Sequence, residues 1–121
     1  MPSNLTSLVQ VIYFTQIYSF NSTHMQVQLR YAVHPQDFRQ YGTQRIREEF
    51  VLTDLFPVGD IALTYSLYDR YIVGGSQPGT TPVALETFEE LRATYFLERR
   101  ELGIINIGGP ALIKADDESY T

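Results

Sequence analysis

The sequence contains no cysteine and no tryptophan, and it has a single lysine, Lys114, and two histidines, His24 and His34. Without cysteine the chain has no disulfide, no thiolate nucleophile and no cysteine-ligated zinc site. Neither histidine has a second histidine or a carboxylate at the spacing of H-x-H or H-E-x-x-H metal sites. We therefore predict no metal ligand in this chain, and we expect His34, beside Pro35, to be a surface or capping residue.

Positive charge is also scarce. The 121 residues carry 9 basic and 14 acidic side chains, a net charge of -5 and a pI near 4.9. Such a chain has no basic surface to follow a phosphate backbone or an anionic membrane. We predict no nucleic acid and no membrane partner. A hydrophobic content of 44% is typical of a globular domain, or of part of one.

The first 24 residues have no charged side chain at all, whereas every charged residue lies at Arg30 or beyond. No secretory signal is predicted, because polar residues interrupt the apolar run 8–20 and no basic residue precedes it. The same run is too short and too polar for a membrane-spanning helix. We interpret residues 1–24 as a non-native or disordered upstream extension, and residues 25–121, which begin at Met25, as an incomplete half-domain.

Two short helices are expected next. His34 to Gly42 has proline at the first helical position and glycine at the stop, and Thr43 is placed to cap a second helix. In that second helix Ile46 and Phe50 are spaced i, i+4, which predicts that both face a core.

From residue 51 onward the pattern indicates strands. Ile61–Tyr68 and 71–73 are predicted to form a hairpin connected at Asp69-Arg70, and residues 86–93 to contain one helical turn. The glycine pairs 74–75 and 108–109 are interpreted as turn glycines. Further strands are expected at Thr94–Leu97, Leu102–Ile107 and Ala111–Lys114. Short strands at this spacing predict a mostly β fold, a sandwich or barrel. Near the end of the sequence an acidic turn is followed by what looks like the opening of another strand that stops mid-element, which indicates truncation.

A charged cluster, Glu98-Arg-Arg-Glu101, separates two of these predicted strands, and two interpretations stay open. It is a solvated hairpin turn whose ion pairs contribute about 0 to 1 kcal/mol each. Alternatively, Arg99 or Arg100 clamps a carboxylate, because a guanidinium group matches that anion with two hydrogen bonds.

Two separated segments, 69–75 (DRYIVGG) and 95–109 (YFLERRELGIINIGG), resemble the N-terminal half of the 5-keto-4-deoxyuronate isomerase family, and 45–50 (RIREEF) fits its leading helix. The resemblance implies a cupin-like fold with two β-barrel halves, in a cytoplasmic homo-oligomer that acts on a small uronate. It also implies a divalent metal, usually zinc, held in the C-terminal half.

The family's metal motif surrounds a Glu-Arg-Arg element, which permits a comparison with Glu98-Arg-Arg100. The positions of the two histidines are then occupied by Tyr95 and Leu97, and that of the glutamate by Leu102, so the resemblance implies a metal-free half. We predict no catalytic residue here and assign no residue to substrate binding.

The implied reaction is the ketol isomerisation of 5-keto-4-deoxyuronate to 3-deoxy-glycero-2,5-hexodiulosonate in pectin and uronate catabolism. It requires a base and an electrophile, and we identify neither in this chain, so we expect the chain to be inactive alone. Two alternatives remain: a metal-free cupin module that binds a uronate through Arg70, Arg99 or Arg100, and a purely structural or oligomerisation domain.

Overall fold

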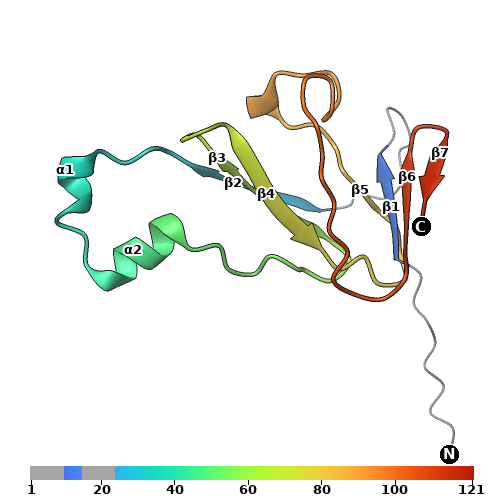
Figure 1. Cartoon of the computed structure of the whole chain (residues 1–121), viewed down its shortest axis with the longest axis horizontal. Coiled ribbons are helices and arrows are strands. Elements are labelled where there is room, and N and C mark those ends of the chain that lie inside the picture. Colours follow the sequence, from blue (N-terminus) through green and yellow to red (C-terminus); the bar gives the residue numbers. More distant parts are fainter. Residues whose placement is uncertain (1–9, 15–23) are drawn as a thin grey trace, which may run out of the picture.

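The computed structural model describes residues 10–14 and 24–121, and in this part the chain forms two β-sheets and three short helical segments (Figure 1). The first sheet contains β2 (Met25–Arg30), β3 (Ile61–Ser66) and β4 (Tyr71–Ser76), in the order β2-β3-β4. β2 and β3 run parallel, whereas β3 and β4 are antiparallel.

β3 is the central strand of this sheet, and its sequence explains its position. All six of its side chains are buried or half-buried, because IALTYS is apolar or small on both faces and suits a strand flanked on each side. The predicted hairpin with β4 is confirmed, although β3 ends at Ser66 rather than Tyr68. Arg70, in the connection, has a φ of 54°, the left-handed conformation of a tight turn.

The second sheet has the order β5-β1-β6-β7. Its strands are β1 (Gln10–Phe14), β5 (Val83–Ala84), β6 (Ala111–Ala115) and β7 (Glu118–Tyr120). β1 pairs in parallel with both neighbours, and β7 is antiparallel to β6. β1 lies within the segment 1–24, of which residues 1–9 and 15–23 fall outside the described part. The interpretation of 1–24 as an upstream extension remains a prediction.

The hydrophobic core joins the two sheets. It is formed by Ile61, Leu63, Val83, Leu85 and Phe96, and Val83 is only 1% exposed. Ile61 and Leu63 come from β3, whereas Val83 comes from β5 in the other sheet. Side chains of β5 and β3 therefore belong to one core that is shared by the two sheets.

The first predicted helix is confirmed as α1 (Pro35–Phe38), a single turn with proline at its start. His34 caps it, since its Nδ1 accepts a hydrogen bond from the Gln36 amide at 3.2 Å. The expected capping role of His34 is thus confirmed.

The second predicted helix is α2 (Thr43–Phe50), and two details of its prediction are wrong. Gly42 is the N-cap and Thr43 is already helical, with no capping hydrogen bond from a side chain. Ile46 is half-buried, but Phe50 is exposed and its ring lies 5.5 Å from that of Phe38. The physical reason is that the two helices lie to one side of the sheets (Figure 1), so that Phe50 contacts the rings of Phe38 and Tyr68 instead of entering the core.

Residues 94–107 contain no strand, so both strands predicted there, and the hairpin turn between them at 98–101, are wrong. Residues 94–95 form a bend and residues 96–99 form turns instead. Phe96 is buried in the core, and the Thr94 amide donates to the Glu98 carboxylate at 2.5 Å, a local bond that competes with strand pairing. The predicted helical turn within 86–93 is confirmed as the 3-10 helix η1 (Glu89–Leu91).

The glycine pair 74–75 lies inside β4, not in a turn, so that interpretation is wrong. A Cβ atom on Gly74 would stand 2.5 Å from the Ala62 carbonyl oxygen, so glycine lets the backbone of β3 approach closely. The strand prediction at residues 111–114 is confirmed by β6.

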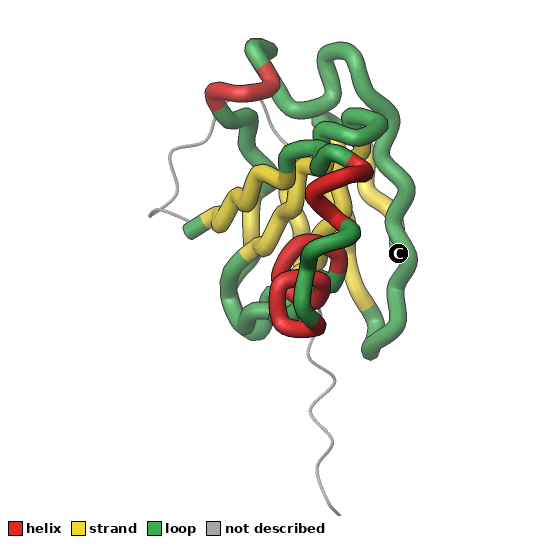
Figure 2. The backbone as a smooth tube through the Cα atoms, turned by 90° about the vertical axis from the view of Figure 1, so that its left-hand side faces the viewer, coloured by secondary structure: helices red, strands yellow, loops and turns green. Residues whose placement is uncertain are grey.

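The fold is mostly β, as predicted, and the two sheets do not close into a barrel. Long connections run outside the strands, as the green tube in Figure 2 shows. Within the described residues, no helix is long and apolar enough to cross a bilayer.

Candidate functional site

The first candidate region is the arginine cluster identified in the sequence, and Arg100 is its most firmly held member. Its Nη1 donates to the Arg70 carbonyl oxygen at 3.0 Å, and its Nη2 donates to the Tyr65 hydroxyl at 3.1 Å. Its Cζ atom also lies 5.1 Å from the centre of the Tyr65 ring, within reach of a cation–π interaction. Arg100 therefore fastens residues 98–100 to the β3–β4 hairpin.

Arg99 points elsewhere. Its Nη2 donates to the Arg92 carbonyl oxygen at 2.9 Å, and its Nε lies 3.7 Å from the Glu98 carboxylate. Arg70 is exposed in the turn after β3. The fold thus brings Arg100 to the main chain of Arg70, whereas Arg99 binds the main chain after η1.

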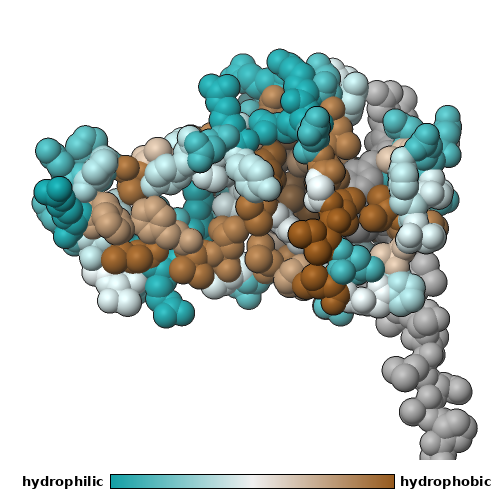
Figure 3. Space-filling model, in the orientation of Figure 1, coloured by the Kyte–Doolittle hydropathy of each residue, from teal (hydrophilic) through white to brown (hydrophobic). Residues whose placement is uncertain are grey.

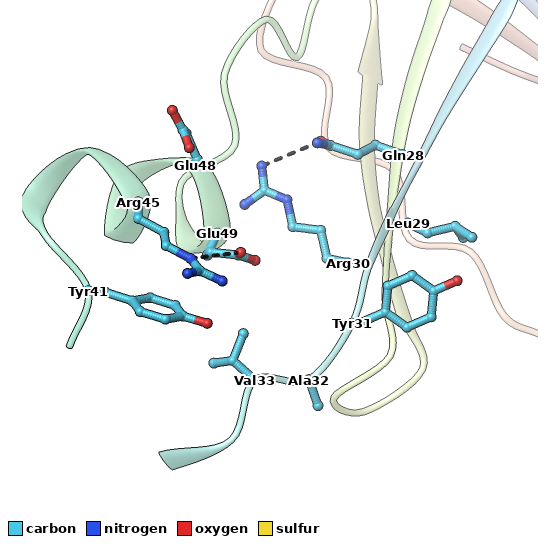
Figure 4. A pocket seen from close by; sticks show the side chains of 10 residues that line it. All are labelled: Gln28, Leu29, Arg30, Tyr31, Ala32, Val33, Tyr41, Arg45, Glu48 and Glu49. Atoms are coloured by element: carbon cyan, nitrogen blue, oxygen red, sulfur yellow. Dashed lines mark hydrogen bonds and ion pairs between the residues drawn. The ribbon is translucent and has the colours of Figure 1, made fainter. Parts of the chain in front are cut away.

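The second candidate region is a cavity of about 350 Å³ at the end of β2 (Figure 4). It lies between the last residues of β2, the extended residues 31–33 that follow, and the helix α2 with the preceding Tyr41. Its wall contains Gln28, Leu29, Arg30, Tyr31, Ala32, Val33, Tyr41, Arg45, Glu48 and Glu49.

Arg30 is the central polar residue of this cavity. Its Nη2 donates to the Val51 carbonyl oxygen at 2.8 Å and contacts the Gln28 amide oxygen at 3.4 Å. Its Nε and Nη1 are buried and make no hydrogen bond to another described residue. Arg30 therefore links the end of β2 to the residue after α2, and two of its donors remain available inside the fold.

The other charged side chains of the cavity are Arg45, Glu48 and Glu49. Arg45 lies 3.8 Å from Glu49 and stacks on the Tyr41 ring at 4.0 Å, as Figure 4 shows. Glu48 accepts a hydrogen bond from Gln44 at 2.9 Å. Two arginines and two glutamates give a polar cavity with no net charge, which suits a small polar molecule or ordered water better than a strongly charged ligand.

Sequence reasoning missed Arg30 and this cavity. A signal was present in Met25-Gln-Val-Gln-Leu29, whose alternation of apolar and polar residues is typical of a strand. That strand places the next residue, Arg30, at the sheet edge beside α2. The cavity itself depends on how α2 folds back, which no local pattern encodes.

The positions that correspond to the family's metal ligands do not fit a zinc site. Tyr95 and Leu102 are exposed and Leu97 packs against the core, and neither leucine carries a ligating atom. Residues 10–14 and 24–121 contain no group of three histidine, cysteine or acidic residues that could hold a metal ion. We therefore derive no catalytic step through a metal from this chain.

Among the described residues, the pKa of Tyr120 is perturbed. The hydrogen bond from the Tyr120 hydroxyl to the Glu118 carboxylate, together with the negative charge of that carboxylate, raises the pKa of Tyr120 above its ordinary value. Both residues are exposed in β7. The shift reflects their neighbourhood in one strand and does not indicate a catalytic group.

Fold and site define a mostly β chain with open sheets, a polar cavity and no metal-binding group among its described residues. Comparison with known proteins then identifies its relatives. The chain is 46% identical over 93 residues to the 4-deoxy-L-threo-5-hexosulose-uronate ketol-isomerase of Bacteroides fragilis, and 50% identical over 91 residues to that of Formosa agariphila. A third relative of the same name, from Lachnoclostridium phytofermentans, is 49% identical over 94 residues. The resemblance found in the sequence is confirmed, and the chain is homologous to these ketol-isomerases.

The alignments cover 77%, 75% and 78% of this chain, but only 33%, 32% and 34% of the three relatives. The chain thus spans about a third of the length of the curated proteins it matches. No family model matches it, and no solved structure matches it.

Proposed function

We propose that this chain is the N-terminal portion of a metal-dependent ketol-isomerase that converts 5-keto-4-deoxyuronate to 3-deoxy-glycero-2,5-hexodiulosonate in pectin and uronate catabolism. The identity of 44–50% to proteins named for this reaction carries the proposal. The substrate is a small uronate. Neither nucleic acid nor a membrane takes part.

In this proposal the chain supplies scaffold and the remainder of the enzyme supplies chemistry. Moving a proton between adjacent carbons requires a base near the substrate and an electrophile that stabilises the enediolate. His34 is occupied as a helix cap, and Glu98 accepts from a main-chain amide. The zinc of the family is bound outside these 121 residues, and the chain alone is inactive.

A chimera tests the proposal. The aligned part of this chain replaces the matching third of the Bacteroides fragilis relative, and isomerisation of 5-keto-4-deoxyuronate is assayed beside the unmodified relative. We expect the chimera to be active and the 121-residue protein to show no turnover with or without added zinc. A folded chimera without activity, or turnover by the short chain, would contradict the proposal.

We further propose a cytoplasmic homo-oligomer. The lack of cysteine and the net charge of -5 support a reducing compartment and a soluble particle. Light scattering of the active chimera measures the number of subunits, and a monomer would contradict this part of the proposal.

A further inference from the structure

Residues 102–107, Leu-Gly-Ile-Ile-Asn-Ile, form what we call the isoleucine segment, and their apolar side chains are exposed. Leu102 and Ile104 are 40% and 43% exposed, and Ile105 and Ile107 reach 87% and 74%. The segment belongs to the connection that leads into β6 across the front of the molecule in Figure 1. Figure 3 shows hydrophobic side chains gathered over this part of the surface.

The isoleucine segment has the composition of a strand but lacks a strand's hydrogen bonds. Three of its six residues are isoleucine, which favours extended backbone. Yet no backbone–backbone hydrogen bond joins residues 101–107 to another residue of the described part. Within residues 10–14 and 24–121, its main-chain donors and acceptors therefore have no strand partner, which is the condition under which another strand can pair with them.

The apolar side chains of the isoleucine segment also predict that, as a strand, it is buried on both faces. In a strand successive side chains point to opposite faces, so strand formation would place Leu102 and Ile104 on one face and Ile105 and Ile107 on the other. Strands with apolar residues on both faces are typical of positions buried on both sides of a sheet. A contiguous apolar surface of this kind is typical of an interface.

We infer that the isoleucine segment becomes a strand and docks onto the part of the ketol-isomerase polypeptide that this chain does not span. The inference rests on the proposed function. The curated relatives contain about twice as much polypeptide again beyond the matched third, and that polypeptide is the source of a covering surface. The partner chemistry is an apolar β-surface with a free strand edge.

Hydrogen exchange followed by mass spectrometry tests this inference. The exchange of amides 102–107 is compared between the 121-residue protein and the chimera described above. We expect fast exchange in the short chain and at least ten-fold slower exchange in the chimera. Light scattering measures whether the 121-residue protein is a monomer or a dimer. A dimer in which amides 102–107 are already protected would show that a second copy of the chain covers the isoleucine segment, and this result would overturn the inference.

Two variants provide the matched comparison. Ile105→Asp combined with Ile107→Asp should leave the circular dichroism of the short chain unchanged, because both side chains are exposed there, but should abolish the protection in the chimera. Val58→Asp, at an apolar residue 73% exposed and outside the cavity, should not affect it.

Exchange in the folded chimera as fast as in the short chain would overturn the docking inference. If the chimera does not fold, exchange is measured for the aligned segment within the unmodified Bacteroides fragilis protein. Protected amides there support the docking inference, and fast exchange overturns it. Activity separates the two proposals: an active chimera with unprotected amides refutes only the docking, and a protected but inactive chimera refutes only the proposed function.

Discussion

At the scale of single residues, two arginines that the sequence analysis kept as candidates for binding a carboxylate make structural hydrogen bonds in the fold. Arg99 and Arg100 are adjacent, and both remained candidates for a carboxylate clamp. In the fold each donates to a main-chain carbonyl oxygen, but only Arg100 joins segments distant in sequence, at Arg70 and Tyr65. We therefore expect Arg100 to contribute more than Arg99 to the free energy of unfolding, although both side chains carry the same charge.

Arg100→Lys is predicted to lower the free energy of unfolding by about 1–3 kcal/mol, because a lysine cannot make both hydrogen bonds and the contact with the Tyr65 ring. Arg99→Lys, at an exposed residue, serves as the control and should change it by less than about 0.5 kcal/mol. Urea denaturation followed by fluorescence of tyrosine measures both. Equal effects would show that Arg100 is not the anchor of residues 98–100.

At the scale of elements, residues 55–56 pack closely against β4 at Gly75, and this close approach requires glycine. A Cβ atom on Gly75 would collide with the Leu55 carbonyl oxygen and with the Phe56 ring. Gly103, in the isoleucine segment, has no atom within 4 Å of the same position. One glycine is thus required by packing, and the other is not.

Gly75→Ala is predicted to destabilise the protein by about 1–3 kcal/mol through overpacking against backbone that cannot easily move. Gly103→Ala should be neutral or slightly stabilising, because it reduces the freedom of the unfolded chain without a clash. Thermal unfolding by circular dichroism compares the two. A neutral Gly75→Ala would mean that residues 55–56 do not pack on β4.

The elements also show which parts of the fold were readable in the sequence. The β3–β4 hairpin, α1 and its His34 cap, η1 and β6 follow from local pattern, because their periodicity or capping residues act within a few positions. Residues 94–107 did not, since Phe96 is drawn into a core shared with β3 and β5 and no partner strand for Leu102–Ile107 exists in the described part. The cavity at Arg30 was equally unreadable, because it arises from the return of α2 toward β2.

At the scale of the whole molecule, the two sheets meet through a small core in which Val83 is the most enclosed side chain. Val83 belongs to β5 of the four-stranded sheet, yet it clusters with Ile61 and Leu63 of β3 in the other. Since the sheets share this core, we expect them to unfold together. A side chain on the surface of the same chain, Val58, is 73% exposed and offers a matched comparison.

Val83→Ala should lower the free energy of unfolding by about 2 kcal/mol, from the loss of buried methyl groups and the cavity they leave. That change corresponds to roughly 30-fold faster amide exchange by global opening, at about 1.4 kcal/mol for each factor of ten. If one core holds both sheets, the exchange of β3 and of β6 rises by the same factor, whereas Val58→Ala leaves both unchanged. Acceleration confined to β6 and its neighbours would show that the sheets open independently, and that the shared core does not couple them.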